Sequence, residues 1–162
     1  MPIKINSIKS GELYILTKDE IESCKKRSSN ASVYKYKTIG EYICNFTIGI
    51  MDCEIKIPEG FLTDGSTRTP DIGISWLFHD YLYAVHCFED LTCSKASISC
   101  TREMADNIMY AIAEYEYNKT KSNIHWFFAA GIKLTAYLNP FYALSKAWKS
   151  SGKRGAEYFV SS

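Results

Sequence analysis

The chain has 162 residues, of which 46% are hydrophobic and 23% charged, as in ordinary folded domains, and this excludes a disordered chain. Nineteen Lys and Arg balance eighteen Asp and Glu to a net charge of +1, so no basic excess indicates a nucleic-acid partner. The N-terminus lacks the apolar stretch of a secretory signal, and Lys133 interrupts the longest apolar run. We therefore expect a protein made in the cytoplasm, without a transmembrane helix and with mostly reduced cysteines.

The first seventy residues have the alternating pattern of strands, rich in Tyr, Ile, Val and Thr. Glycines stand where the turns between these segments would fall, at Gly40 and Gly49. The expected strands are Leu13–Thr17, Ser32–Thr38, Glu41–Thr47 and Met51–Ile57. The charged segment 18–29 is either a helical turn or a loop. An antiparallel meander is the simplest arrangement of these strands.

After Pro70 the apolar period changes toward 3.6, which indicates helices. We expect helices over 74–88, 102–118, about 122–138 and 140–149, with a connecting loop over 89–100. Thr101 is a suitable N-cap for the second of these helices. The predicted fold class is α+β: a small N-terminal antiparallel β-meander followed by a three- to four-helix bundle. The chain then forms a single domain, 1–162, with a β-rich part (1–70), a helical part (71–150) and a loose tail (151–162).

The densest group of reactive side chains begins on the first expected helix. His79 and Tyr83 are four residues apart and share a helix face, while Asp80 points in a neighbouring direction. This geometry would let His79 act on one group while Asp80 holds a cation beside it. The alternative is a core histidine next to a solvated aspartate.

Asp106, near the start of the following helix, is the candidate partner of His79. If the two helices pack antiparallel, its carboxylate can lie beside the face that carries His79. A carboxylate bonded to one imidazole nitrogen fixes the tautomer and leaves the other nitrogen as a general base. Alternatively, Asp106 is a surface residue that interacts with the helix dipole.

A tight turn precedes this helix in the stretch FLTDGSTRTP. Asp-Gly favours a positive φ, and Asp64, Gly65 and Ser66 would present the carboxylate and carbonyl oxygens that calcium prefers. The alternative is a simple corner between the β-rich and helical parts. His86 lies two turns after His79 and is a weaker candidate ligand.

The ordered motifs IPEGFLTDGSTRTP, HDYLY and MADNIMYAI resemble a family of short bacterial and phage proteins of unknown function. That family shares a GFxTDGxSxP turn, an HDxxY helix and a later helix containing an aspartate. The resemblance covers roughly residues 40–138 and implies no particular activity.

The same HDxxY pattern, with an aspartate on a partner helix, resembles the active site of phospholipases A2, particularly the viral-capsid type. The resemblance implies that His79 activates water, that Tyr83 and Asp106 orient its imidazole, and that Asp80 binds Ca²⁺. Backbone carbonyls near Asp64, Gly65 and Ser66 would replace the glycine-rich calcium loop, which this chain lacks.

Three hypotheses follow. The first is a phospholipase A2-like, calcium-dependent hydrolase that cleaves lipid esters at a phospholipid or membrane surface. The second is a non-catalytic phage or virion structural protein, with virion proteins as partners, in which a buried His-Asp-Tyr network rigidifies the core. The third is a different metal-dependent hydrolase with zinc or manganese held by Asp64, His79, Asp80 and His86.

Overall fold

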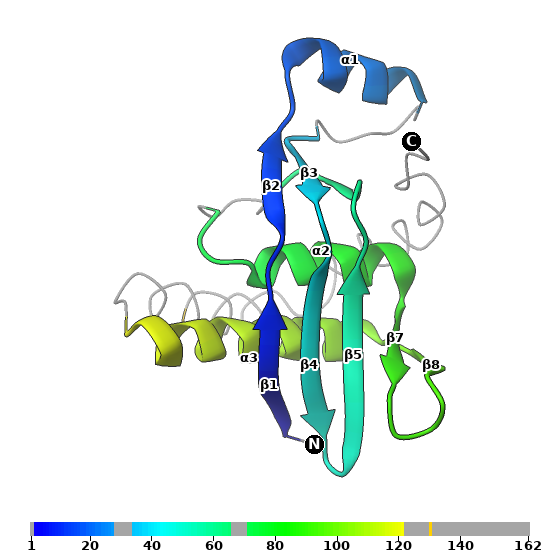
Figure 1. Cartoon of the computed structure of the whole chain (residues 1–162), viewed down its shortest axis with the longest axis vertical. Helices are drawn as coiled ribbons and strands as arrows, with labels where there is room; N and C mark the ends of the chain where they lie inside the picture. The colour runs from blue at the N-terminus through cyan, green and yellow to red at the C-terminus, as the bar shows by residue number, and fades with distance from the viewer. Residues whose placement is uncertain (1, 28–33, 66–70, 122–129, 131–162) are drawn as a thin grey trace.

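The computed structural model of the chain describes residues 2–27, 34–65, 71–121 and 130. Within these ranges the chain forms eight strands in two antiparallel sheets, together with three helices (Figure 1). The larger sheet has the strand order β1-β4-β5-β7-β8. Its strands are β1 (Ile3–Lys9), β4 (Tyr42–Ile48), β5 (Met51–Ile57), β7 (Cys87–Asp90) and β8 (Ala96–Ser99).

The centre of the larger sheet is the hairpin of β4 and β5, whose register ends with Ile48 opposite Met51. Gly49, the first residue of the two-residue turn, has a φ of 63°, which a glycine adopts without steric cost. The two strands alternate buried and more exposed residues. One face of the hairpin is therefore available to cover a hydrophobic core.

A second, three-stranded sheet has the order β2-β3-β6. Its strands are β2 (Glu12–Ile15), β3 (Tyr36–Ile39) and β6 (Leu62–Thr63), and helix α1 (Lys18–Arg27) follows β2. A separate small cluster of Leu16, Tyr34 and Leu62 is buried beside this sheet. The sheet matters for the site because β6 leads directly into Asp64 and Gly65.

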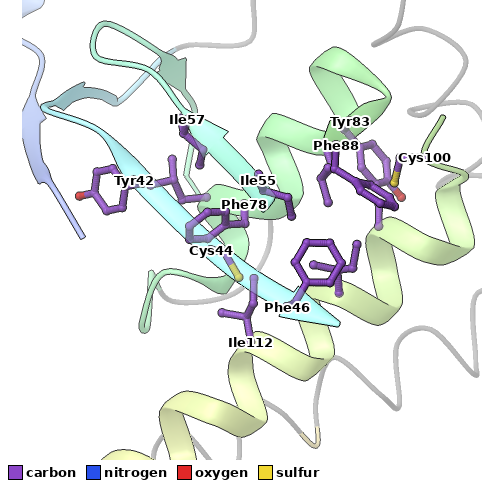
Figure 2. Packing of buried hydrophobic residues seen from close by; sticks show 14 of the residues in the cluster. Tyr42, Cys44, Phe46, Ile55, Ile57, Phe78, Tyr83, Phe88, Cys100 and Ile112 are labelled. Carbon is purple, nitrogen blue, oxygen red and sulfur yellow. The ribbon is translucent and has the colours of Figure 1, made fainter. Parts of the chain in front are cut away.

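Helices α2 (Ser75–Val85) and α3 (Arg102–Thr120) pack against each other and run across the strands of the larger sheet (Figure 1). Side chains from β4, β5 and both helices meet in one core, including Phe46, Phe78 and Ile112 (Figure 2). The predicted N-cap of α3 is confirmed, because Thr101 Oγ1 accepts a hydrogen bond from the Met104 amide at 3.2 Å. This packing places the reactive residues of the two helices opposite one another.

The predicted architecture of a small meander followed by a helix bundle is wrong. After α2, which ends at Val85, the chain returns to the larger sheet and adds β7 and β8. The sequence pattern assigned the first two residues of β7 to the end of the helix 74–88, and the rest of β7 and all of β8 to the loop 89–100. Phe88 and Asp90 are buried while Cys87 and Glu89 are partly exposed, which is strand alternation over only four residues. β1 was also missed, and it pairs with β4 along its length. The predicted helices over 122–138 and 140–149 and the tail 151–162 lie outside the described residues, apart from residue 130.

No helix in the described part of the chain is both long enough and apolar enough to cross a membrane.

The return of the chain to the sheet at β7 can be tested with Phe88. Its side chain is 3% exposed and packs edge-on against Phe46, with ring centroids 5.4 Å apart. We expect Phe88→Ala to lower the free energy of unfolding by about 3–5 kcal/mol, because it leaves a cavity in the core. The control is Leu91→Ala, three residues further along the chain, where the side chain is 37% exposed. It should lower the free energy of unfolding by about 1 kcal/mol or less. Urea denaturation measures both, and equal small losses would contradict the placement of β7.

Candidate active site

α2 and α3 bring His79, Tyr83 and Asp106 into direct contact. His79 Nε2 lies 3.1 Å from Asp106 Oδ1, and the Tyr83 hydroxyl donates to the same oxygen at 2.9 Å. The rings of His79 and Tyr83 lie one helical turn apart, with centroids 4.1 Å apart. The structure therefore brings together the three residues that the sequence motifs singled out.

Asp106 also interacts with a residue that the sequence analysis missed. Arg102 Nη1 lies 3.7 Å from Asp106 Oδ2, one turn earlier on α3. The i,i+4 spacing of Arg and Asp was a usable signal for this pair. Side-chain exposure is 17% for Asp106 and 26% for Arg102, so the carboxylate is partly desolvated while it holds three partners. Such a carboxylate is well positioned to orient its neighbours.

The two ring nitrogens of His79 have different environments. A carboxylate can only accept hydrogen bonds, so Nε2 carries the proton that bonds to Asp106, and Nδ1 is the unprotonated nitrogen of the neutral ring. Nδ1 lies 3.8 Å from Asp80 Oδ1, and the His79 side chain is 18% exposed. Burial lowers the pKa of His79, but the hydrogen bond that the ring donates to Asp106 and the nearby Asp80 carboxylate outweigh burial, so the pKa is raised above 6.5.

Tyr83 is a neutral donor in this arrangement. Burial and the adjacent Asp106 both raise the pKa of its hydroxyl above the usual value of 10.0. Its ring belongs to the same buried hydrophobic cluster as Phe88 and Cys100 (Figure 2). Tyr83 thus anchors the carboxylate of Asp106 to a packed part of the molecule.

Asp80 connects α2 to the turn that follows β6. The Thr63 hydroxyl donates to Asp80 Oδ2 at 2.5 Å, and the Gly65 amide donates to Thr63 Oγ1 at 3.2 Å. Thr63 is 2% exposed and was not predicted as a site residue, although it lies inside the TDGS motif. The contact positions one carboxylate oxygen of Asp80 and links the smaller sheet to the site.

Asp64 and Gly65 directly follow β6, and Gly65 has the positive φ that the Asp-Gly pair predicts, whereas Ser66 lies outside the described residues. Gly65 is buried with a φ of 82°, and a Cβ there would lie 2.9 Å from Asp71 Oδ1. Asp64 is exposed, yet desolvation and the nearby charges of Asp80 and Asp71 raise the pKa of its carboxyl to about 6. The turn therefore lies close to two further carboxylates.

Asp71, one of these two carboxylates, is bonded to two residues at the start of β3. Asp71 Oδ2 accepts from Lys35 Nζ and from the Tyr36 hydroxyl, each at 2.5 Å. Lys35 and Tyr36, the latter on β3, gave no sequence signal because they lie more than thirty residues before Asp71. The contact ties the chain just before α2 to the smaller sheet.

The described residues do not by themselves form a metal centre. No three His, Cys, Asp or Glu side chains among them are arranged to hold an ion. Calcium takes six to eight oxygen ligands, whereas one oxygen of Asp80 is already bonded to Thr63. His86, the further ligand of the third hypothesis, follows the end of α2 with a left-handed φ of 56°. Calcium, zinc and manganese binding remain predictions from the sequence.

No protein-family model, curated protein sequence or solved structure matches the chain. The function must therefore be argued from the geometry of the site itself. What that geometry offers is a histidine held at Nε2 by a carboxylate, with Nδ1 next to a second carboxylate and part of the ring exposed to solvent.

The effect of Asp106 on His79 gives a direct test of this geometry. Asp106→Asn removes the negative charge beside Nε2, so burial, which lowers the pKa of His79, is opposed mainly by Asp80. We expect an NMR pH titration of the imidazole to give a lower pKa in this variant than in the unmodified protein. Asp19→Asn on α1 serves as the control and should leave the titration unchanged. Identical His79 titrations in the Asp106 variant and the parent would rule out the contact.

Proposed function

We propose that the protein is a hydrolase in which His79 is the general base and a lipid ester is the substrate class. The observation that supports the proposal best is the contact of His79 Nε2 with Asp106 at 3.1 Å, which leaves Nδ1 as the basic nitrogen of a partly exposed ring. The lipid substrate rests on the resemblance of the HDxxY helix to phospholipases A2.

In this mechanism a water molecule bound at Nδ1 attacks the carbonyl carbon of the ester. His79 takes one proton from the water, and the water oxygen forms a bond to the carbon, giving a tetrahedral oxyanion. The imidazolium is stabilised by Asp106, which Tyr83 and Arg102 hold in place. When the oxyanion collapses, the alkoxide leaves and takes the proton from His79, and a fatty acid and an alcohol are released.

Calcium binding is proposed only because the HDxxY helix resembles that of phospholipases A2. Asp80 and the turn of Asp64, Gly65 and Ser66 would hold it, and it would supply positive charge for the oxyanion.

Fatty-acid release from mixed phospholipid vesicles, measured with calcium and with a chelator, tests the proposal. His79→Ala should slow release by about 100-fold or more, because it removes the base. Tyr83→Phe should slow it less, since it removes only one hydrogen bond to Asp106. Tyr110→Phe removes a hydroxyl that bonds to the exposed Glu114 on α3, and it should be as active as the parent.

The outcomes separate the hypotheses. Equal release by the His79 variant and the parent would refute His79 as the base. No release under any condition from folded protein would instead favour the structural hypothesis. That hypothesis has its own support, because Asp106 bonds to side chains of α2 and interacts with Arg102 on α3. These contacts would stabilise the packing of the two helices even if the protein catalysed no reaction.

The pH dependence of release gives a further prediction. A general base acts only when it is unprotonated, so activity should rise with pH through the pKa of His79, above 6.5. In Asp106→Asn the remaining activity should show this rise at a lower pH, because the pKa of His79 is lower there. An initial-rate profile over neutral pH measures both midpoints. An unchanged midpoint in the variant would contradict the assignment of the rise to His79.

A further inference from the structure

Two atoms of adjacent side chains on α2 lie close together without bonding. His79 Nδ1 and Asp80 Oδ1 are 3.8 Å apart, and the two side chains are 18% and 26% exposed. A hydrogen bond needs about 2.7–3.2 Å between its heavy atoms, so these two atoms do not bond directly. When polar atoms are more than about 3.5 Å apart, a water molecule between them is the arrangement to consider. The partial exposure of both side chains gives water access to the pair.

One water molecule fits the separation of these two atoms. If its oxygen lies about 2.8 Å from each, the two atoms subtend an angle of about 85° at that oxygen, so each O–H bond can point at one of them with only slight bending. In the neutral ring Nδ1 is an acceptor, and a carboxylate oxygen is always one. A single water can therefore donate one hydrogen to His79 and the other to Asp80.

The other carboxylate oxygen of Asp80 is fixed by Thr63. The Thr63 hydroxyl accepts from the Gly65 amide at 3.2 Å, and it donates its own hydrogen to Asp80 Oδ2 at 2.5 Å. Hydrogen bonds linked in this way polarise and strengthen one another. Because Oδ2 is held by Thr63, Oδ1 keeps its direction toward His79.

Thr63 is itself held by the smaller sheet. Its side chain is 2% exposed, it lies opposite Tyr36 in the register of β3 and β6, and its carbonyl oxygen accepts from the Lys35 amide at 2.9 Å. The φ of 82° at Gly65 lets the chain turn so that the Gly65 amide points back at the Thr63 hydroxyl. A group held this firmly can keep a reactant in a productive orientation.

We propose that His79 Nδ1 and Asp80 Oδ1 together hold the water that attacks the ester, and that Thr63 is the positioning residue that aims Asp80. The proposal rests on the proposed function for the ester and on the geometry of this pair for the water. During attack one hydrogen of the water passes to Nδ1, the other stays bonded to Asp80 Oδ1, and the water oxygen bonds to the carbonyl carbon. The resemblance to phospholipases A2 implies a different role for Asp80, that of a Ca²⁺ ligand.

Crystal structures of the parent, Thr63→Ser and Thr63→Val, grown with a chelator, test the water site without any substrate. We expect an ordered water about 3 Å or less from both Nδ1 and Oδ1 in the parent and in the Ser variant, because serine keeps the hydroxyl. Valine has the shape of threonine without the hydroxyl, so Asp80 should turn and the water should be lost. The same water in the Val variant, or a direct bond between His79 and Asp80, would overturn the proposal.

The same crystals grown with calcium compare the two roles of Asp80. A water keeps distances of about 2.7–3.0 Å to its acceptors, whereas calcium lies about 2.3–2.6 Å from oxygen ligands. A water that stays in place supports the proposal. A calcium ion bound to Asp80 in place of the water would overturn it.

Fatty-acid release by these variants tests the part that the water plays in the reaction. Thr63→Val should lower kcat by about tenfold or more with little change in KM, because the water is misaligned while the contacts to the substrate remain. Thr63→Ser should retain most of the parental kcat. Parental kcat in Thr63→Val would overturn the positioning role of Thr63.

Thr38 on β3 offers a matched control. It is fully buried, and its hydroxyl also accepts from a backbone amide, that of Phe61 at 2.9 Å, and donates to the Pro58 carbonyl at 2.8 Å. Thr38→Val should lose comparable stability but keep the parental kcat, because this hydroxyl bonds to the backbone and not to a carboxylate of the site. An equal fall of kcat in the two Val variants would reduce the role of Thr63 to stability and overturn the proposal.

Asp80→Asn applies if Thr63→Val does not fold. The Thr63 hydroxyl donates to the amide oxygen, so the amide nitrogen takes the position of Oδ1 and cannot accept from the water. We expect kcat to fall, and added calcium should not restore it. Recovery of kcat at higher calcium would assign Asp80 to the metal and overturn the proposal.

Failure of this inference and failure of the proposed function give different results. If the parent releases fatty acid but its crystals hold no water between His79 and Asp80, the hydrolase stands and the inference is overturned. If the parent releases none, ester hydrolysis is refuted, and the crystals alone decide whether Thr63 and Asp80 form a water site beside His79.

Discussion

The contact on which the site depends is the one between the Asp106 carboxylate and two side chains of α2. A carboxylate that accepts from His79 and Tyr83 through one oxygen must lie opposite the face that carries both residues. That requires α3 to run antiparallel to α2, with its first turns beside the later turns of α2. The larger sheet provides the surface on which the two helices can pack in this way, because the buried residues of β4 and β5 lie against both. The hydrogen bonds of the site are therefore a consequence of the apolar core beneath them.

A second carboxylate, at the other end of α3, holds the other end of α2. Asp106 meets the later turns of α2, and Glu116 meets its first amide. The two differ in solvation and in partners. Asp106 has two hydrogen-bond donors and the nearby Arg102, whereas one oxygen of Glu116 is unpaired among the described residues. α2 is thus held by one carboxylate with three side-chain partners and by one that is bonded to the backbone at the start of the helix.

The sequence predicted the local parts of the site and missed the parts that depend on distant pairing. The spacing of His79 and Tyr83 and the N-cap Thr101, which places Asp106 early in α3, are helix-periodic signals and could be read directly. Two hydrogen bonds join segments that are far apart in the sequence: Thr63 to Asp80, 17 residues apart, and Ile74 to Glu116, 42 residues apart. No local sequence pattern could predict them. The fold class was wrong for a similar reason. Four residues of alternation at Phe88 are too few to indicate a strand until β5 is known to lie beside them.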